Sequence, residues 1–526
     1  MHQHGLTRDN SGHAVIPVQS GCRSARSRGP VNVRHNIIAN FAGRAWSALM
    51  ALAFLPLYIR FLGIESYGLI GVFVSLTALL SVFDMGLSTT LNRELARLSA
   101  NNGAEQEARD LVRTFEWIYW GTGLLLGGVI ALMAPLIARD WLNAQGVAVQ
   151  TVEQAILLIG LVVALQWPNS LYSGGLMGLQ RQVLLNAIRV VAATLQAGGA
   201  VLVLWLVSPT IIAFFLWQSL IGTLHTAIVG VWLWKSLPGS AAPVFRKALL
   251  AANLRFAGGV AGITLLVTIL TQTDKIVLSK MLSLEAFGYY SLAAVIAGAL
   301  TYVSSPIFSA LFPRFTQAIG AGNAAEVASL YHKGSQLMAA LVSPVWIFMA
   351  LFSEELLLLW FGDAPTVAGT HLLVSLLVTG TALNALVTLP YALQLAHGWT
   401  ALSFYKNVIS IAIFVPLLFW LIAQYGAAGA ALAWIGLNAG YFLFEVPLMH
   451  RRLLRGSMGR WYLMDVGLPV ALCLGVGLIA RFAMPSGLPA YGVLLWILSA
   501  FTLCILCVAL AMPHTREWVR QLAFLR

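Results

Sequence analysis

Charged residues are scarce in this sequence, and their scarcity sets the class of protein. Only 10% of the 526 residues are Asp, Glu, Lys or Arg, whereas 59% are hydrophobic. A water-soluble domain carries about 25% charged residues. A surface so poor in charge cannot face water throughout, so most of the chain must face lipid or other buried helices. We therefore expect an all-α polytopic membrane protein.

The sequence also lacks the short motifs that mark common enzyme sites. It contains no phosphate-binding loop ending in Gly-Lys-Ser/Thr, no metalloprotease or kinase motif and no nucleophile elbow. Its four cysteines show no metal-ligand spacing with histidine, and Cys473, Cys504 and Cys507 lie in apolar runs where thiols usually pack. We expect no catalytic residues, no metal site and no cofactor.

Long apolar runs separated by short polar breaks fill the rest of the chain. Runs of about 20 residues are long enough to cross a bilayer as helices. They predict about fourteen transmembrane helices, at 37–60, 66–90, 114–138, 153–178, 182–206, 210–234, 254–281, 286–311, 334–352, 366–395, 399–423, 427–449, 462–483 and 489–511.

The polar breaks divide these helices into two similar six-helix lobes and two extra C-terminal helices. Residues 1–35 have no hydrophobic core of a signal peptide, so we interpret them as a basic, disordered cytoplasmic tail. The remaining expected units are an N-terminal lobe (36–235), a cytoplasmic linker (236–253), a C-terminal lobe (254–450), the two extra helices (451–511) and a basic amphipathic cytoplasmic tail (512–526).

The basic residues indicate the orientation. A net charge of +12 would suggest nucleic acid as the partner of a soluble protein, but in a membrane protein Lys and Arg concentrate in cytoplasmic segments. With the N-terminus inside, 23 of the 31 Lys and Arg residues fall in cytoplasmic segments and 4 in outer loops. This asymmetry predicts that both termini are cytoplasmic and that nucleic acid is not a partner.

A short motif recurs after 220 residues. The segment 60–68 (RFLGIESYG) aligns with 280–288 (KMLSLEAFG), and both keep a basic residue, a leucine, a glutamate, an aromatic residue and a glycine at matching positions. Each copy joins the first two helices of its lobe. Because each lobe has an even number of helices, the repeat is parallel, with a pseudo-twofold axis along the membrane normal. Binding sites in such transporters lie near mid-membrane at the repeat interface.

Polar side chains within the predicted helices point to a water-filled lumen, because each is costly in lipid. The second helix carries Thr77, Ser81, Asp84 and Ser88 at helical spacing. The seventh carries Thr264, Thr268, Thr271, Lys275 and Ser279 in the same way. Ser and Thr also bind helices to one another in membranes, so stripes that contain a charge indicate a lumen more strongly.

Basic residues lie two or three turns inside the cytoplasmic ends of three helices. Arg44, Arg189 and Lys406, with Arg93 and Arg97 at the inner mouth, could form a basic vestibule open to the cytoplasm. Arg offers paired donors that match phosphate oxygens, so the vestibule suits an anionic headgroup. The alternative is that these long side chains extend to the membrane surface, since two turns span only about 10 Å. Lys275 is a further substrate-binding candidate.

Two intramembrane aspartates are candidate proton or cation coupling sites, Asp274 and Asp84. Asp274 lies beside Lys275 in the outer half of its helix. Adjacent helical residues point about 100° apart, so we do not expect them to form a simple ion pair. The alternative to coupling is a structural ion pair with another helix.

Several of these residues resemble one transporter family. Phe83-Asp-Met-Gly-Leu87 followed by Arg93, the turn ending at Gly68, and 273–278 (TDKIVL) leading to 287–290 (FGYY) are similar to the polysaccharide transport family. That family belongs to the multidrug/oligosaccharidyl-lipid/polysaccharide exporter superfamily and includes bacterial O-antigen and exopolysaccharide repeat-unit flippases. The resemblance covers about residues 32–455.

The resemblance implies a V-shaped pair of lobes in the bacterial inner membrane and alternating access powered by an ion gradient or the membrane potential. It also implies flipping of undecaprenyl-diphosphate-linked oligosaccharide, with membrane lipids, a glycan polymerase and export machinery as partners. Many O-unit flippases have twelve helices rather than fourteen, so a peptidoglycan-precursor flippase stays open. A drug/cation antiporter is disfavoured because the first helix carries Arg44 and no acid. A membrane glycosyltransferase or polymerase would need a large outer loop, and none is expected.

Overall fold

The computed structural model describes residues 33–99 and 103–512, and this part of the chain is almost entirely helical. The predicted tails at 1–35 and 512–526 therefore lie mostly outside the described residues. Twelve helical stretches within the described ranges are long and apolar enough to cross a membrane. The prediction of an all-α polytopic membrane protein is confirmed.

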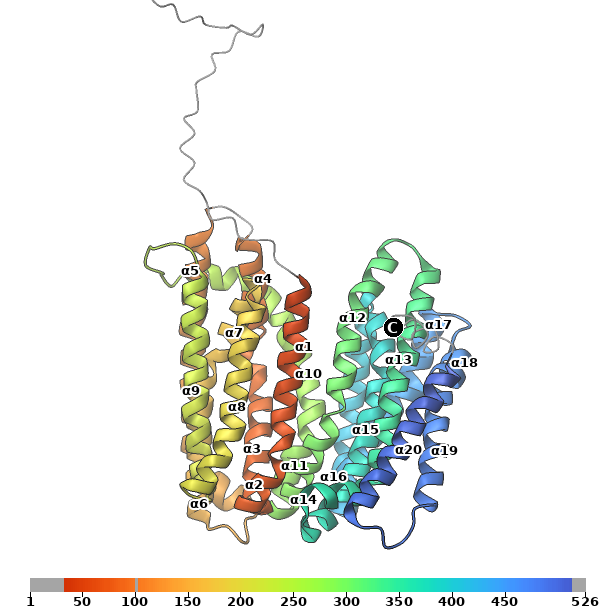
Figure 1. The fold of residues 1–526 in the computed structure, drawn as a ribbon. Coiled ribbons are helices and arrows are strands. Elements are labelled where there is room, and N and C mark those ends of the chain that lie inside the picture. Colours follow the sequence, from red (N-terminus) through yellow and green to blue (C-terminus); the bar gives the residue numbers. More distant parts are fainter. Residues whose placement is uncertain (1–32, 100–102, 513–526) are drawn as a thin grey trace, which may run out of the picture.

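The helices form two groups that lie side by side (Figure 1). The first group consists of α1 (Val33–Ala53), α2 (Leu55–Leu62), α3 (Ile64–Leu80), α4 (Leu87–Ser99), α5 (Glu105–Leu136), α6 (Val149–Gln166), α7 (Pro168–Gly178), α8 (Gln182–Leu206) and α9 (Ile211–Ser236). The second consists of α11 (Leu284–Gly298), α12 (Thr301–Gly320), α13 (Ala324–Leu351), α14 (Ser353–Phe361), α15 (Ala364–Ala396), α16 (Thr400–Gly440) and α17 (Val446–Leu453). We call these groups the N-lobe and the C-lobe.

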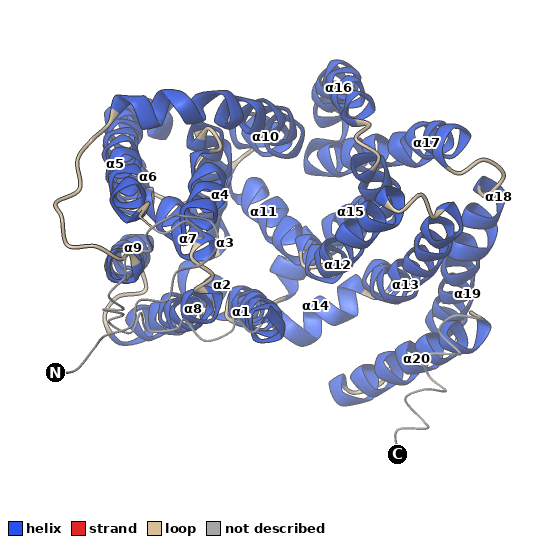
Figure 2. Cartoon of the chain, turned by 90° about the horizontal axis from the view of Figure 1, so that it is seen from above, coloured by secondary structure: helices blue, strands red, loops and turns tan. Residues whose placement is uncertain are grey.

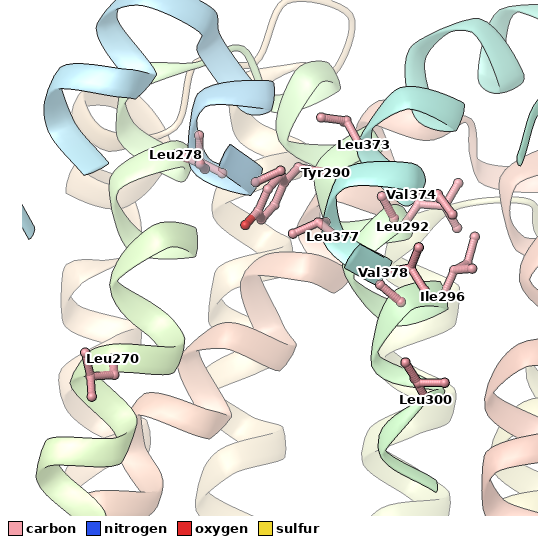
Figure 3. Packing of buried hydrophobic residues seen from close by; sticks show 14 of the residues in the cluster. Leu270, Leu278, Tyr290, Leu292, Ile296, Leu300, Leu373, Val374, Leu377 and Val378 are labelled. Carbon is pink, nitrogen blue, oxygen red and sulfur yellow. The ribbon is translucent and has the colours of Figure 1, made fainter. Parts of the chain in front are cut away.

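The long helix α10 (Lys247–Met281) lies between the lobes. It contacts α16 on one side and α3, α4 and α5 on the other, and the view from above shows it near both groups (Figure 2). Its apolar residues Leu270 and Leu278 belong to the same buried cluster as Tyr290 of α11 and Leu373 of α15 (Figure 3). The helix therefore joins the two lobes rather than belonging to one of them alone.

Helix α16 reverses direction within its own length. Gly426 has φ +56° and ψ −133°, a conformation outside the helical region that a residue without Cβ adopts easily. The reversal brings Lys406 of the first half within 3.0 Å of Glu445, which follows the second half. Residues 400–425 and 427–440 are thus two antiparallel helices.

The remaining helices α18 (Met458–Arg460), α19 (Leu468–Phe482) and α20 (Ala490–Ala511) pack against the C-lobe. Phe348 and Phe352 of the C-lobe are buried with Cys473 and Cys504 of α19 and α20. Both cysteines are free and buried, as packing residues would be. Apolar side chains that remain exposed, such as Phe482 and Leu510, are typical of a lipid-facing surface.

The repeated motif forms the contact between the lobes. A Cβ added to Gly68 of α3 would lie 2.6 Å from the carbonyl oxygen of Leu284, and one added to Gly288 of α11 would lie 2.3 Å from that of Ile64. The two contacts are related by the same 220-residue offset as the motifs. Gly71 in turn faces Ser291, its own counterpart. The repeat therefore packs against itself across a local twofold axis, at one end of the molecule.

Candidate functional site

The second predicted membrane helix, expected to run without interruption over 66–90, is broken in the structure. Helix α3 ends at Leu80, a 3-10 turn η1 follows at Ser81–Asp84, and α4 begins only at Leu87. Met85 and Gly86 between them have φ angles of +50° and +68°. Broken helices at membrane depth are tolerated where they line a cavity. Asp84 lies at this break, in a position that can line a cavity.

Three hydroxyl groups hold the Asp84 carboxylate at this break. Tyr119 of α5 donates a short hydrogen bond to Oδ1, and Ser170 of α7 donates to the same oxygen over 3.2 Å. Ser88 of α4 donates to Oδ2 over 2.8 Å. No cation is paired with this carboxylate among the described residues. Asp84 is therefore an intramembrane acid stabilised by neutral donors.

Asp84 lines a cavity of about 580 Å³, which we call the N-lobe cavity and which both polar and apolar side chains line. All four residues of the predicted stripe on the second helix face it: Thr77, Ser81, Asp84 and Ser88. The opposite walls come from the consecutive helices α6 and α7, from α8 and from α10, which contribute Gln166, Trp167, Asn169, Ser170, Ser173, Arg189 and Thr264. The cavity therefore combines one carboxylate and one guanidinium with many hydroxyl and amide groups.

Helices α1 and α8 fix the cationic wall of this cavity. The Asn186 amide donates a hydrogen bond of 2.5 Å to the Asn40 side-chain oxygen, and a Cβ on Gly43 would come within 2.5 Å of the Asn186 amide oxygen. Arg189 lies one turn further along α8 and donates to Asn186 over 3.4 Å. Arg44 follows Gly43 on α1, but its side chain is outside the described part of the structure. The two predicted basic residues are thus on adjoining helices.

The arginines predicted at the inner mouth share one buried acid. Arg93 and Arg97 of α4 both donate to Glu94, over 2.6 and 2.7 Å. Burial by itself would raise the pKa of the Glu94 carboxyl, but the hydrogen bonds from Arg97 and Arg93 outweigh it and lower that pKa. Glu107 of α5 lies 3.6 Å from Arg97 as a second acid, so the two arginines at the mouth are held in a network of charges.

Lys406 lies in the C-lobe, and an acid that the sequence analysis did not single out neutralises it. Its ammonium is 3.0 Å from the buried carboxylate of Glu445 and lies over the rings of Tyr441 and Tyr391, at 4.4 and 5.2 Å. Gln394 donates a further hydrogen bond to Glu445 over 3.0 Å. These groups border a second cavity of about 200 Å³, the C-lobe cavity, which Thr271 of α10 also lines. Arg189 and Lys406 thus face different cavities.

Asp274 and Lys275 pair with each other, contrary to the expectation from helical geometry. The Lys275 ammonium lies 3.3 Å from both Asp274 oxygens and donates to the Thr271 carbonyl over 2.9 Å. The Cα–Cβ bonds of the two residues do point apart, but the four-carbon lysine side chain is long enough to fold back onto Asp274. The Tyr290 hydroxyl, visible in Figure 3, donates to Asp274 over 2.6 Å. Asp274 is thus held by a cation and a hydroxyl.

The sequence prediction missed a second intramembrane acid besides Glu445. Glu116 of α5 is buried and accepts hydrogen bonds from Tyr172 over 2.6 Å, from Trp234 over 3.1 Å and from Arg113 over 2.7 Å. Glu116 and Glu445 both fall inside predicted apolar spans. The criterion that selected Asp84 and Asp274, a charge within an apolar run, applies equally to both. Among the described residues no group of three His, Cys, Asp or Glu side chains could hold a metal ion.

Comparison with known proteins adds sequence and structural relatives. Residues 33–319 match the family model described as "Polysaccharide biosynthesis protein". The chain is 24% identical over 421 residues to a "Putative O-antigen transporter" of Shigella flexneri, an alignment that covers 77% of this chain and 94% of the relative. It is 23% identical over 466 residues to the "Lipopolysaccharide biosynthesis protein WzxC" of Escherichia coli K12, covering 84% and 87%.

Solved structures share the fold. The lipid II flippase MurJ in an inward closed conformation superimposes with a TM-score of 0.66, at 13% identity over 90% of this chain and 97% of that chain. The multidrug transporter DinF-BH of the MATE type gives a TM-score of 0.59, at 15% identity over 82% and 97%. At these identities the structural likeness establishes the architecture and leaves the substrate open.

Proposed function

Because this chain belongs to the polysaccharide biosynthesis protein family, we propose that it is a flippase for a lipid-linked oligosaccharide, the substrate class that the family resemblance implies. It would move an undecaprenyl-diphosphate-linked repeat unit from the inner to the outer leaflet during O-antigen or related polysaccharide synthesis. The family match over 33–319 carries the proposal, and the O-antigen transporter relative supports it. The chain is a member of a transporter family rather than of an enzyme family.

We infer fourteen membrane crossings. The twelve stretches found in the structure treat Thr400–Leu453 as one and do not include α10. The reversal at Gly426 divides the first into two antiparallel helices, and α10 has 35 residues, more than the roughly 20 needed to cross a bilayer. Counting both gives six helices in the unit 36–235, six in the unit 254–450, which consists of α10 together with the C-lobe, and the pair at 451–511.

The charges support an orientation with both termini in the cytoplasm. Arg93 and Arg97 lie at the end of α4, and Arg451 and Arg452 in the last turn of α17, whereas Glu354 and Glu355 begin α14 near the opposite end. In this orientation the glycine contact between α3 and α11 closes the outer end of the lobe interface. The lobes separate toward the cytoplasmic end, where α1 and α12 diverge (Figure 1). Such a state would admit substrate from the inner leaflet.

The N-lobe cavity would receive the polar part of the substrate. Its volume of about 580 Å³ lies within the range of small-molecule sites, about 300–1,000 Å³. Arg189, with Arg44 on the adjoining helix and Arg93 at the mouth, supplies charge for the diphosphate, and the hydroxyl and amide walls suit sugar hydroxyls. Lys275 and Lys406 do not line the N-lobe cavity and pair with Asp274 and Glu445 instead.

A drug/cation antiporter is a second candidate, and one observation favours it. Asp84 places a carboxylate without a cationic partner in the N-lobe cavity, as binding of an organic cation would require. The cavity also contains Arg189, which would repel such a ligand. The flippase therefore remains the better account.

Complementation tests the proposal directly. In a bacterial strain lacking its own O-unit flippase, expression of this chain should restore surface glycan, measured by gel banding of extracted lipopolysaccharide. Triple replacement of Arg44, Arg93 and Arg189 by Gln should abolish the restoration while the protein reaches the membrane in normal amount. Failure of the wild-type chain to restore glycan in strains with several repeat-unit structures, together with resistance to cationic dyes, would favour the antiporter.

A further inference from the structure

The two copies of the repeated motif create two corners at the outer end of the lobe interface, and one of them is closed. There Asn143, in the loop after η2 (Ile137–Trp141), donates to the carbonyls of Lys280 and Leu282 over 3.1 and 3.3 Å. The Leu284 amide donates back to the Asn143 carbonyl over 2.9 Å. Glu65 accepts the amides of Gln145 and Gly146 over 2.6 and 2.7 Å. This corner is filled by protein.

The corner related to it by the repeat is hollow. A cavity of about 810 Å³ lies between α2 and α3 of the N-lobe and α11, α14 and α15 of the C-lobe. We call it the outer corner cavity. Arg60, the counterpart of Lys280, and Glu285, the counterpart of Glu65, both line it. Asp363 lies 220 positions after Asn143 and is its counterpart in the repeat. Asn143 closes the first corner by donating hydrogen bonds, whereas an ionised Asp363 side chain can only accept them.

Three aromatic residues complete the lining of this cavity: Tyr289, Trp360 and Phe361. Trp360 at the end of α14 lines it and is 37% exposed. The Tyr289 ring lies flat on α15, since a Cβ on Gly369 would be 2.8 Å from three of its ring carbons. The Tyr289 hydroxyl donates to Glu285 over 3.1 Å, and one Asp363 oxygen accepts the Thr366 amide over 3.0 Å. These bonds orient both carboxylates and leave each with a second oxygen able to accept.

From this arrangement we propose that the outer corner cavity binds one sugar ring of a glycan on the outer face of the membrane. Glu285 and Asp363 accept hydrogen bonds from ring hydroxyls, which are donors of suitable number and spacing. Trp360 and Tyr289 present flat apolar surfaces to the C–H face of a pyranose. Arg60 donates to an oxygen of a carboxylate or acetamido substituent on that ring. Its volume of about 810 Å³ lies within the range of small-molecule sites.

This inference rests on the proposed function for its biological meaning, because it assigns the cavity to the glycan as it leaves the outer end. A sugar held at this corner would lie between the lobes beside the α3–α11 contact. Binding there would be weak, since a release site must also let the product go.

Ligand-detected NMR on the full-length protein in lipid nanodiscs tests the site. The probes are N-acetylglucosamine and glucuronic acid, with glycerol as the negative control. Wild-type protein should transfer saturation to at least one sugar at millimolar concentration. Glu285→Gln and Trp360→Leu should each weaken that binding about two- to tenfold. Glu354→Gln, a carboxylate change on α14 outside the cavity, should not alter it.

The outcomes separate this proposal from the flippase assignment. No saturation transfer to either sugar, or unchanged binding in both Glu285→Gln and Trp360→Leu, overturns the outer site even if the wild-type chain restores surface glycan. Sugar binding that depends on Glu285 and Trp360, in a chain that fails to restore glycan, upholds the site and overturns the flippase. Trp360→Tyr keeps an aromatic surface and should retain sugar binding. Binding in this variant shows that the loss in Trp360→Leu comes from the missing aromatic ring and not from misfolding.

Discussion

At the scale of single residues, the structure sorts the intramembrane charges by their partners. Lys406 and Lys275 each have an acid within about 3 Å, and Glu116 is bonded to Arg113. Asp84 instead has, within the part of the chain that the structure describes, hydroxyl donors alone, and it faces a cavity. Buried ion pairs are costly to break by removing one partner and much cheaper to remove together. The two kinds of charge should therefore respond differently to substitution.

Lys406→Met should destabilise the protein by about 3 kcal/mol, because it leaves Glu445 buried without its cation. Lys406→Met combined with Glu445→Gln should recover most of that loss. Thermal unfolding of the purified variants measures both effects. If Lys406→Met unfolds at the wild-type temperature yet abolishes glycan export, Lys406 contacts the substrate after all.

Asp84→Asn should preserve the fold, since its amide oxygen can still accept from Tyr119 and its NH2 group can donate to the Ser88 hydroxyl oxygen, but it should uncouple transport from an imposed gradient. A proton crossing the field gains about 2.3 kcal/mol per 100 mV, which is sufficient to bias a two-state transporter. Flux of a fluorescent lipid-linked sugar in proteoliposomes, with and without a pH gradient, is the measurement.

Asp274→Asn is the matched comparison for Asp84→Asn. Because Lys275 and Tyr290 hold Asp274, we expect its loss to lower stability rather than to change the gradient dependence. The reverse pattern, a stable Asp274 variant that no longer responds to the gradient, would move the coupling role to Asp274.

At the scale of elements, breaks in helices and close contacts between helices indicate which segments can move. Helix α3 ends at Leu80 and α11 ends at Gly298, so the second helix of each lobe is interrupted at nearly the same place in the repeat. Before these breaks the two helices cross at Gly68 and Gly288, which face backbone carbonyl oxygens, and at Gly71, which faces the Ser291 side chain. A crossing with so few side chains between the helices can separate and re-form with little repacking.

Gly68→Ala and Gly288→Ala should each keep the outer ends of the lobes apart, because the added Cβ would sit within 2.6 Å of a backbone carbonyl oxygen. Glycan export should fall severalfold while the protein remains folded. Gly128→Ala on α5, where a Cβ meets nothing within 4 Å, is the control and should be neutral or slightly stabilising. Wild-type export in both interface variants would contradict an opening at this contact.

At the scale of the whole molecule, the architecture is a pair of lobes joined by α10 and a self-complementary glycine contact, with two further helices on the C-lobe. The N-lobe cavity and the C-lobe cavity both border α10. Thr264 of this helix faces the N-lobe cavity, and Thr271 faces the C-lobe cavity. A movement of α10 relative to either lobe would change both cavities together.

Reporter fusions after residues 105, 245 and 456 should read cytoplasmic, and fusions near 358 and after 425 should read periplasmic. The last position distinguishes fourteen crossings from a smaller number, because it lies at the reversal of α16. A cytoplasmic reading at 425 would remove one crossing on each side of that turn and overturn the count.

The sequence by itself determined the membrane class, the approximate helix spans and the repeat, because the cost of placing polar groups in lipid acts on every residue separately and leaves a pattern along the chain. It also selected the stripe at Thr77, Ser81, Asp84 and Ser88, which does share one cavity. Which charges are neutralised could not be predicted in this way. Glu445 lies 39 positions from Lys406, Tyr119 lies 35 positions from Asp84, and Tyr290 lies 16 positions from Asp274, while Lys275 folds back on its neighbour Asp274. Pairing depends on distances of a few ångströms between helices, and only the tertiary packing decides those distances.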